Sequence, residues 1–263
     1  MRNNCLADRL LKKSAAWGIV DLWSSTSSDF VAHQGNYSLI TEKEYAGELL
    51  GLIGDVKGMS CLDVGCGGGM LSNELASLGA SMFAVDVSYK AVKHASLSGR
   101  VIGVQANGEK LPYANGTFDF CISTDVIEHI VEYATVLDEI MRSLKPKGTA
   151  LLAVPNAYST KNLLLDFFFP LVKGSLKKGI GHKPPKPSRG HINLFSKRGF
   201  TKLLEEKGYS TVDVTVCRMP DDSRNKFLVN LLSSLIGLVL PSTLNDQCIF
   251  TVRKSSPGES SAR

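Results

Sequence analysis

The spacing of apolar residues along this chain changes several times between a helical and a strand-like period. A capping box at Thr41 and Glu44 precedes an apolar stripe at helical spacing, which Tyr45, Leu49, Leu50 and Ile53 form. After this predicted helix, short apolar runs alternate with helical stretches. The runs that predict strands are 59–65, 81–88, 100–107, 117–125 and 149–156, and the stretches that predict helices are 71–80, 88–97 and 133–148.

The predicted strands are apolar runs rather than a clean alternation of apolar and polar residues. Such strands are typical of a parallel sheet that is covered by helices on both faces. We therefore expect an α/β fold with a doubly wound sheet and right-handed crossovers. The helix over 133–148 is expected to stop at Pro146 and Gly148.

Beyond Asn156 the alternation weakens. The pattern predicts an apolar helix over 161–174, then a basic, proline-rich loop, a helix over 196–209, and strands over 210–219 and 246–254. We expect three parts of the chain: an N-terminal helical extension (1–40), one domain (41–254) with a helical and basic insertion (160–195), and a disordered tail (255–263).

Length and composition narrow the class of protein. A chain of 263 residues with 43% hydrophobic and 21% charged residues is suited to one folded domain. The net charge of +5 is concentrated between Lys173 and Lys202, where nine basic residues occur without an acidic one. The six cysteines show neither a C-x-x-C pair nor zinc spacing, and no apolar signal segment begins the chain, so we expect a reduced, cytoplasmic protein without a metal site.

The stretch LDVGCGGGM, Leu62 to Met70, has four glycines at a predicted strand-to-helix turn. Such a turn brings a bare backbone and a helix N-terminus to a ligand. The dinucleotide pattern G-x-G-x-x-G fails because Met70 stands at its third glycine, and the phosphate loop fails because no Gly-Lys-Ser/Thr follows. What remains is D-x-G-x-G-x-G.

This pattern resembles motif I of the class I S-adenosylmethionine-dependent methyltransferases, and the resemblance continues from Cys61 to Asn156. Motif I is also similar to that of the ubiquinone-biosynthesis O-methyltransferases. The resemblance implies a Rossmann-like sheet of seven strands, with an antiparallel last strand near Cys248 to Val252. It also implies S-adenosyl-L-methionine as cofactor, whose ammonium group suits the acidic residue Asp63 beside the glycine turn.

The resemblance also implies the cofactor-binding residues. Asp86 ends the second predicted strand, where the family's acid binds the ribose hydroxyls, and Val87 beside it is expected on the adenine face. Asn107 stands where the family commonly has Asp as acceptor of the adenine amino group. The full predicted set is Asp63, Gly65, Cys66, Gly67, Gly69, Asp86, Val87, Asn107, Gly108, Glu109, Ser123 and Thr124.

Each single piece of this set has a plainer interpretation. A glycine-rich turn is often only a turn, and an acid at a strand end is often a helix cap. The joint order of the motifs, with 23 residues from Asp63 to Asp86, favours the cofactor site.

Methyl transfer from a sulfonium is an in-line displacement, so the protein mainly has to align the acceptor with the methyl group. A general base is needed only when the acceptor arrives protonated. His191 is the first candidate and His129 the second, with Glu128 as a weaker one. A structural role for His129 is equally compatible with the sequence.

The acceptor is not specified by a motif. Enzymes of this superfamily that methylate amide or base amino groups carry an Asn/Asp-Pro-Pro-aromatic motif where this chain has Ser123 to Val126, so we expect no nucleic acid partner. We expect O- or C-methylation of a small-molecule or lipid-like acceptor. A protein of this fold that binds S-adenosylmethionine or a membrane partner without catalysis is the alternative.

Two apolar segments, 163–172 and 227–240, are too short to span a bilayer. Either can be an ordinary core helix. The first, with the basic stretch after it, also fits a lid over an acidic substrate or an interfacial helix in peripheral contact with a membrane. The sequence does not predict the oligomeric state.

Overall fold

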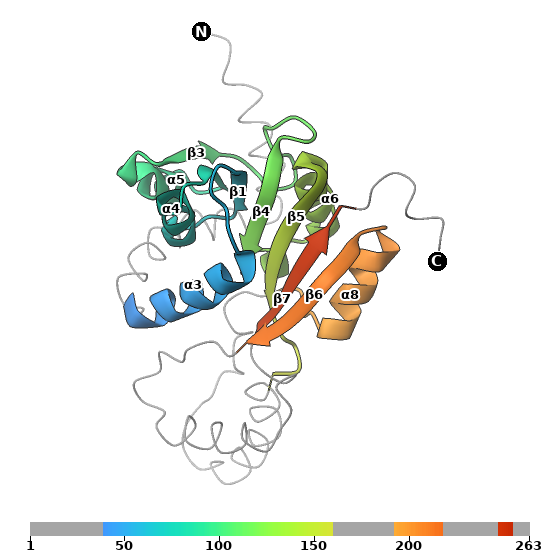
Figure 1. The fold of residues 1–263 in the computed structure, drawn as a ribbon. Helices are drawn as coiled ribbons and strands as arrows, with labels where there is room; N and C mark the ends of the chain where they lie inside the picture. Colours follow the sequence, from blue (N-terminus) through green and yellow to red (C-terminus); the bar gives the residue numbers. More distant parts are fainter. Residues whose placement is uncertain (1–38, 160–191, 218–246, 255–263) are drawn as a thin grey trace, which may run out of the picture.

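The structure is a computed structural model that describes residues 39–159, 192–217 and 247–254 (Figure 1). Most of the predicted N-terminal extension, residues 160–191 of the predicted insertion and the predicted tail lie outside the described residues. The apolar segments 163–172 and 227–240 lie outside them as well.

A seven-stranded sheet forms the centre of the molecule, with the order β3-β2-β1-β4-β5-β7-β6. All neighbouring pairs among the first five strands are parallel, and β7 is antiparallel to both β5 and β6. This confirms the predicted doubly wound sheet with an antiparallel last strand. The strands are β1 (Ser60–Val64), β2 (Ser81–Asp86), β3 (Val101–Gln105), β4 (Phe118–Thr124), β5 (Leu144–Pro155), β6 (Ser210–Cys217) and β7 (Gln247–Arg253).

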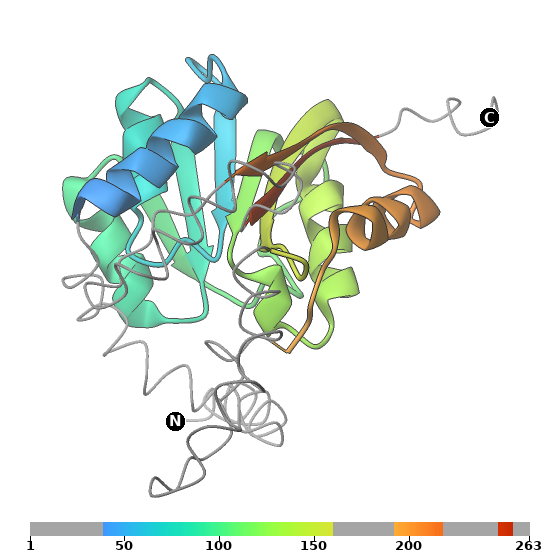
Figure 2. The same ribbon diagram turned by 90° about the horizontal axis from the view of Figure 1, so that it is seen from below.

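Helices cover both faces of the sheet (Figure 2). On one face lie α3 (Leu39–Ile53), α4 (Met70–Ser77) and α5 (Tyr89–Ala95), and on the other lie α6 (Tyr133–Ser143) and α8 (Lys197–Glu206). Two single turns of 3₁₀ helix, η1 (Ser96–Ser98) and η2 (Ile127–His129), follow α5 and β4. None of the helices described here is long and apolar enough to cross a membrane.

The strand β5 shows why the predicted strands are apolar runs. Leu151 and Ala153 pack into a core cluster with α3 and α4, while Leu152 and Val154 pack into a second cluster with α6 and α8. Because side chains of a strand alternate between the faces of the sheet, both faces of β5 need apolar residues. Each fully buried Leu or Val side chain contributes roughly 1.5–3 kcal/mol to the stability of the fold.

The boundary between α6 and β5 differs from the prediction. The helix ends at Ser143, and the strand begins at Leu144 instead of near residue 149. Leu144 is buried and pairs with Phe118, and the register then shifts before Thr149 pairs with Phe120. Burial of Leu144 in the sheet therefore ends the helix before Pro146 is reached.

The first described helix also differs slightly at its start. It begins at Leu39, two residues before the predicted capping residue Thr41. Helix ends are commonly defined only to within one or two residues.

An aromatic contact joins α8 to the sheet. The ring of Phe200 is fully buried, with its centroid 4.8 Å from those of both Phe195 and Phe250. We expect Phe200→Ala to lower the free energy of unfolding by about 3–5 kcal/mol, since it leaves a cavity between α8 and β7. Chemical denaturation measures this change. Lys202→Ala, at an exposed position of the same helix, is the control and should change stability by less than about 0.5 kcal/mol.

Candidate cofactor site

The glycine turn lies at the carboxyl end of β1, where the chain turns into α4. Gly65, Gly67 and Gly69 have positive φ angles of 80°, 50° and 76°. A Cβ atom on Gly65 would lie 2.2 Å from a methyl carbon of Val126, and one on Gly69 would lie 2.3 Å from the Cβ atom of Ala95. The turn therefore needs glycine at both positions, for its backbone conformation and for the close approach of its neighbours.

Side chains of α4 and α5 hold this turn in place through hydrogen bonds. The Nδ1–H of His94 donates to the Gly68 carbonyl oxygen at 2.8 Å, and the Nδ2 atom of Asn73 donates to the carbonyls of Gly69 (2.7 Å) and Ala95 (3.0 Å). The Asn73 side chain in turn accepts from Ser98 Oγ. These supporting residues could not be identified from the sequence, because they belong to no motif.

Asp86 ends β2 beside the turn. Its Oδ2 atom accepts the Gly67 N–H at 3.0 Å, and its Oδ1 atom accepts the Ser88 N–H at 2.8 Å. Burial raises the pKa of this carboxyl group, and the two backbone hydrogen bonds oppose that shift. Each carboxylate oxygen has a second lone pair, so Asp86 retains acceptors for a diol. The next residue, Val87, is 48% exposed, as a residue that contacts a ligand ring needs to be.

Asp63 lies beneath the turn rather than at its surface. The residue is 4% exposed, and its Oδ2 atom accepts from Ser72 Oγ of α4 at 2.5 Å. Loss of hydration raises its pKa to about 7, the Ser72 hydrogen bond opposes this, and the nearby Asp86 adds to it. The predicted attraction between Asp63 and the ammonium group of the cofactor stays a prediction. Cys66, also predicted at the site, is half-buried, with its sulfur 3.6 Å from the Gly67 carbonyl oxygen.

The residues after β3 form the next wall. Asn107 is exposed, and its Oδ1 atom accepts the Glu109 N–H at 3.0 Å. Gly108 is buried, and a Cβ atom there would meet methyl carbons of Val64 and Val136 at 3.4 Å. The side chain of Asn107 therefore shapes its own loop as well as facing solvent.

The two polar residues at the end of β4 lie differently from each other. Ser123 is 1% exposed, and its hydroxyl donates to the Val64 carbonyl of β1 at 3.0 Å. Thr124 is only partly buried. Ser123 thus links the strands beneath the site, and its predicted place in the wall of the methionine pocket stays a prediction, as does that of Thr124.

The acid and histidine that follow β4 lie in η2. Glu128 is 1% exposed, and loss of hydration, with the nearby Asp125 as second cause, raises its pKa to about 8. His129 is partly buried, with its Nε2 atom 3.8 Å from Glu128 Oε1. The positive φ of 55° at Asp125 makes the preceding turn sharp, and Gln247 donates to the Asp125 carboxylate at 2.6 Å.

His191, the first candidate for the general base, lies outside the described residues. The residues that follow it are fixed beside η2. The N–H groups of Ile192 and Asn193 donate to the Glu128 carbonyl at 2.9 and 3.0 Å, and Asn193 Nδ2 donates to the Ile130 carbonyl at 2.6 Å. The chain therefore comes back to the carboxyl ends of the strands after residue 191.

The contacts described so far bring the predicted residues to one edge of the sheet. The Gly67 N–H donates a hydrogen bond to the Asp86 carboxylate, and the Asp86 carbonyl accepts the Ala106 N–H at 3.1 Å. Gly108 packs on Val64. Ligands of doubly wound sheets bind at this edge, where the strand order reverses between β1 and β4. A bare turn, an acid for a diol and an exposed apolar residue together fit the methionine, ribose and adenine parts of S-adenosylmethionine.

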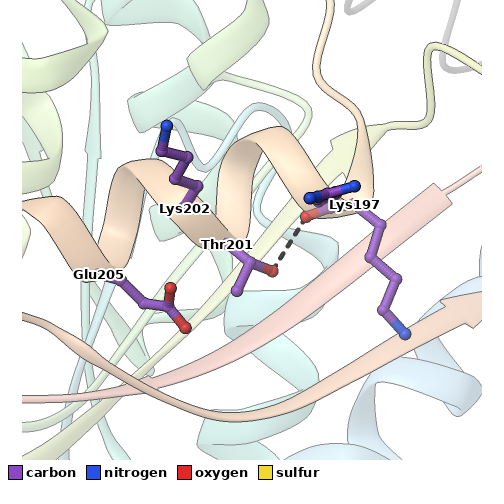
Figure 3. Close-up of a pocket in the computed structure, with 5 residues that line it drawn as sticks. Lys197, Thr201, Lys202 and Glu205 are labelled. Carbon is purple, nitrogen blue, oxygen red and sulfur yellow. Dashed lines mark hydrogen bonds between the residues drawn. The ribbon is translucent and has the colours of Figure 1, made fainter. Parts of the chain in front are cut away.

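A separate surface hollow lies along α8 (Figure 3). It is lined by Lys197, Arg198, Thr201, Lys202 and Glu205, and Thr201 Oγ1 donates to the Lys197 carbonyl within it at 2.9 Å. All of these residues belong to one helix, and none of them is a predicted site residue.

The chain matches the model of a known protein family. A family model described as a methyltransferase domain matches residues 32–214. The matched range includes the glycine turn, Asp86, the loop after β3 and η2.

Comparison with curated proteins gives relatives that share a name. The chain is 31% identical to the ubiquinone biosynthesis O-methyltransferase of Rhizobium rhizogenes over 159 residues, which are 57% of this chain and 62% of that protein. It is 41% identical to the mitochondrial ubiquinone biosynthesis O-methyltransferase of Schizosaccharomyces pombe over 106 residues, 36% of this chain and 38% of that protein. The chain thus spans less than two thirds of the length of these relatives.

Solved structures share the fold. Magnesium protoporphyrin IX methyltransferase from Synechocystis, solved with bound SAH, has a TM-score of 0.62 and 17% identity, with 91% of this chain and all of that chain covered. A Haloferax volcanii methyltransferase in complex with its activator Trm112 has the same TM-score and 14% identity, with 90% and 98% covered.

The raised pKa of Asp63 generates a prediction about stability. Between the ordinary pKa of 3.8 and the folded value of about 7, the unfolded chain has released a proton that the folded protein retains. The free energy of unfolding therefore falls as the pH rises through this range. Asp63→Asn keeps an acceptor for Ser72 and removes this loss.

Denaturant titrations of both proteins between pH 4 and pH 7.5 measure the effect. Asp86 and Glu128 titrate in both proteins, so the difference between the two curves belongs to Asp63. We expect a flatter dependence on pH for Asp63→Asn. Parallel curves would mean that folding does not raise the pKa of Asp63.

Proposed function

This chain belongs to the methyltransferase domain family, and on that premise we propose that it transfers a methyl group from S-adenosyl-L-methionine to a small-molecule acceptor. The main support for this proposal is the hydrogen bond between the Gly67 N–H of the glycine turn and the Asp86 carboxylate at the end of β2. It brings the turn for the methionine part and the acid for the ribose hydroxyls to adjoining strand ends.

We assign the remaining contacts to the predicted residues. Val87 lies against the adenine ring, and Asn107, Gly108 and Glu109 form the far wall of the adenine pocket. Thr124, with Ser123 beneath it, lies under the methionine part. Gly65, Cys66 and Gly69 shape the turn around it.

The bound cofactor supplies a methyl group on a positively charged sulfur, which leaves as a neutral thioether. The chain's own residues therefore have to hold the acceptor in line with that methyl group, and alignment alone lowers barriers by up to ~7–11 kcal/mol. A hydroxyl acceptor also has to lose its proton. We propose His129 or His191 as the base, with Glu128 behind His129.

The acceptor is proposed from the relatives and from the sequence. The relatives are named as O-methyltransferases, and Ser123 to Val126 lack the motif of enzymes that methylate base amino groups. We therefore propose O-methylation of a small-molecule or lipid-like acceptor, without a nucleic acid partner. The apolar segment 163–172 with its basic flank supports peripheral contact with a membrane.

Methyl transfer from isotopically labelled S-adenosylmethionine tests the proposed function. The purified protein is incubated with a metabolite extract that has been separated into an aqueous and a lipid fraction, and labelled products are detected by mass spectrometry. We expect a product from the lipid fraction, and more of it when anionic vesicles are present. Cofactor binding without any labelled product would favour the non-catalytic alternative, and a product from the aqueous fraction alone would exclude a lipid acceptor.

Asp86→Ala tests the assignment of the ribose contact. Because it removes the acceptor of two hydroxyl groups, we expect the dissociation constant for S-adenosylmethionine to rise by roughly 100-fold or more in calorimetry. Asp55→Ala is the matched control, since it also removes a carboxylate that accepts a backbone N–H but lies in the exposed turn before β1. Equal affinity for Asp86→Ala and the wild type would refute the assignment.

His129→Gln tests the base. For a residue that removes the proton of the acceptor, we expect kcat to fall by roughly 10²- to 10⁴-fold while the dissociation constant for S-adenosylmethionine is unchanged. A decrease in cofactor affinity with normal kcat would assign His129 to the edge of the cofactor pocket. Normal values of both would leave His191 as the base, and His191→Gln would then be expected to lower kcat.

A further inference from the structure

The loop between β3 and β4 begins at the proposed adenine wall and is held at its far side by one ion pair. Residues Ala106–Thr117 connect the two strands, and Asn107 to Glu109 stand at the start of this loop. Glu139 and Arg142 lie one turn apart on α6, and their side chains bind the backbone of this loop.

Two hydrogen bonds join the side chains of Arg142 and Glu139. Arg142 Nε donates to Glu139 Oε1 at 2.6 Å, and Arg142 Nη2 donates to Glu139 Oε2 at 2.8 Å. Both side chains are partly buried. Two parallel bonds between a guanidinium and a carboxylate fix the orientation of both groups, in contrast to a single contact of a lysine.

The pair also holds the backbone of the loop. Glu139 Oε2 accepts the Leu111 N–H at 2.8 Å, while Arg142 Nη2 donates to the Leu111 carbonyl at 3.3 Å. Arg142 Nη1 donates to the Tyr113 carbonyl at 2.8 Å and to Asn115 Oδ1 at 2.7 Å. Four groups of the loop are therefore bound by two side chains of one helix.

Further contacts link this part of the loop to the proposed adenine wall, Asn107 to Glu109. Gly108 lies against Val136 of the same helix, and the Lys110 N–H donates to the Asn107 carbonyl at 3.0 Å. The Tyr113 ring packs on Phe118 of β4, with 4.9 Å between the ring centroids. Only one residue separates Leu111, held by the ion pair, from Glu109.

We propose that Glu139 and Arg142 are positioning residues for the cofactor, which hold the loop after β3 so that Asn107 to Glu109 face the adenine ring. The inference rests on the proposed function, because it requires the adenine wall to lie in this loop. Neither side chain touches the cofactor. Their loss lets the loop move away from α6 and widens the adenine pocket, while the turn at Gly65 to Gly69 and Asp86 keep their contacts.

Arg142→Ala and Arg142→Lys test this inference in the full chain. Asp138→Ala is the matched control, because Asp138 lies on the same helix and binds Lys207 at 2.7 Å and Tyr209 at 2.7 Å, away from the loop. Calorimetry gives the dissociation constant of S-adenosylhomocysteine for each protein, and thermal unfolding gives its stability.

We expect Arg142→Ala to raise that dissociation constant by about tenfold, a change that corresponds to the loss of a few hydrogen bonds on the loop. Arg142→Lys should recover only part of the affinity, because an ammonium group cannot bind Glu139 and the loop carbonyls in the same geometry. Asp138→Ala removes an ion pair of the same helix and should leave the affinity unchanged. In a methyl-transfer assay, Arg142→Ala should raise KM for S-adenosylmethionine more than it lowers kcat.

Two outcomes overturn the inference. Equal affinity of Arg142→Ala and the wild type would show that the loop does not depend on the pair, and a loss of affinity in Asp138→Ala as large as that in Arg142→Ala would assign the effect to general destabilisation. Both differ from failure of the proposed function, in which the wild-type protein itself does not bind S-adenosylhomocysteine or transfers no methyl group.

Discussion

The close approach of the turn after β1 to its neighbours is the constraint on which the rest of the site depends. Val126 and the backbone of α5 occupy the space that side chains at Gly65 and Gly69 would fill. The bare turn therefore joins β1, α5 and the segment after β4 at one point. Because Gly67 is bonded to Asp86 there, the position of the turn also fixes the acid at the end of β2.

Asp63 and Glu128 are buried and Asp86 is partly buried near this edge of the sheet, and loss of hydration raises the pKa of each of them. Asp63, Asp86 and Glu128 thus favour the protonated form more than exposed carboxylic acids do. A cationic ligand reverses this preference, because it stabilises the ionised form of nearby acids. In the proposed function, the same groups favour a sulfonium and an ammonium over a phosphate.

Most of the fold was predictable from the sequence, because a sheet buried on both faces leaves apolar runs in its central strands, such as β5. The antiparallel last strand followed from the family resemblance rather than from the pattern. The start of β5 at Leu144 was not predictable, since Leu144 continues the helical spacing of Leu137, Ile140 and Met141, and Pro146 and Gly148 indicate a later end of the helix. Only the pairing of Leu144 with Phe118 decides the boundary. In the site, Asp86 ends β2 as predicted, and its contact with the ribose stays a prediction. Ser72, Asn73 and His94 belong to no motif and appeared only in the structure.

The sequence by itself determined the order of strands and helices, the glycine turn and the acid at the next strand end, because these depend on local period and on residue types at fixed spacing. The tertiary structure alone decided which atoms the polar groups meet. Asp63 is bonded to Ser72, Ser123 to the Val64 carbonyl, and Arg142 to the loop after β3. Such contacts join residues from different elements, and their distances depend on how those elements pack.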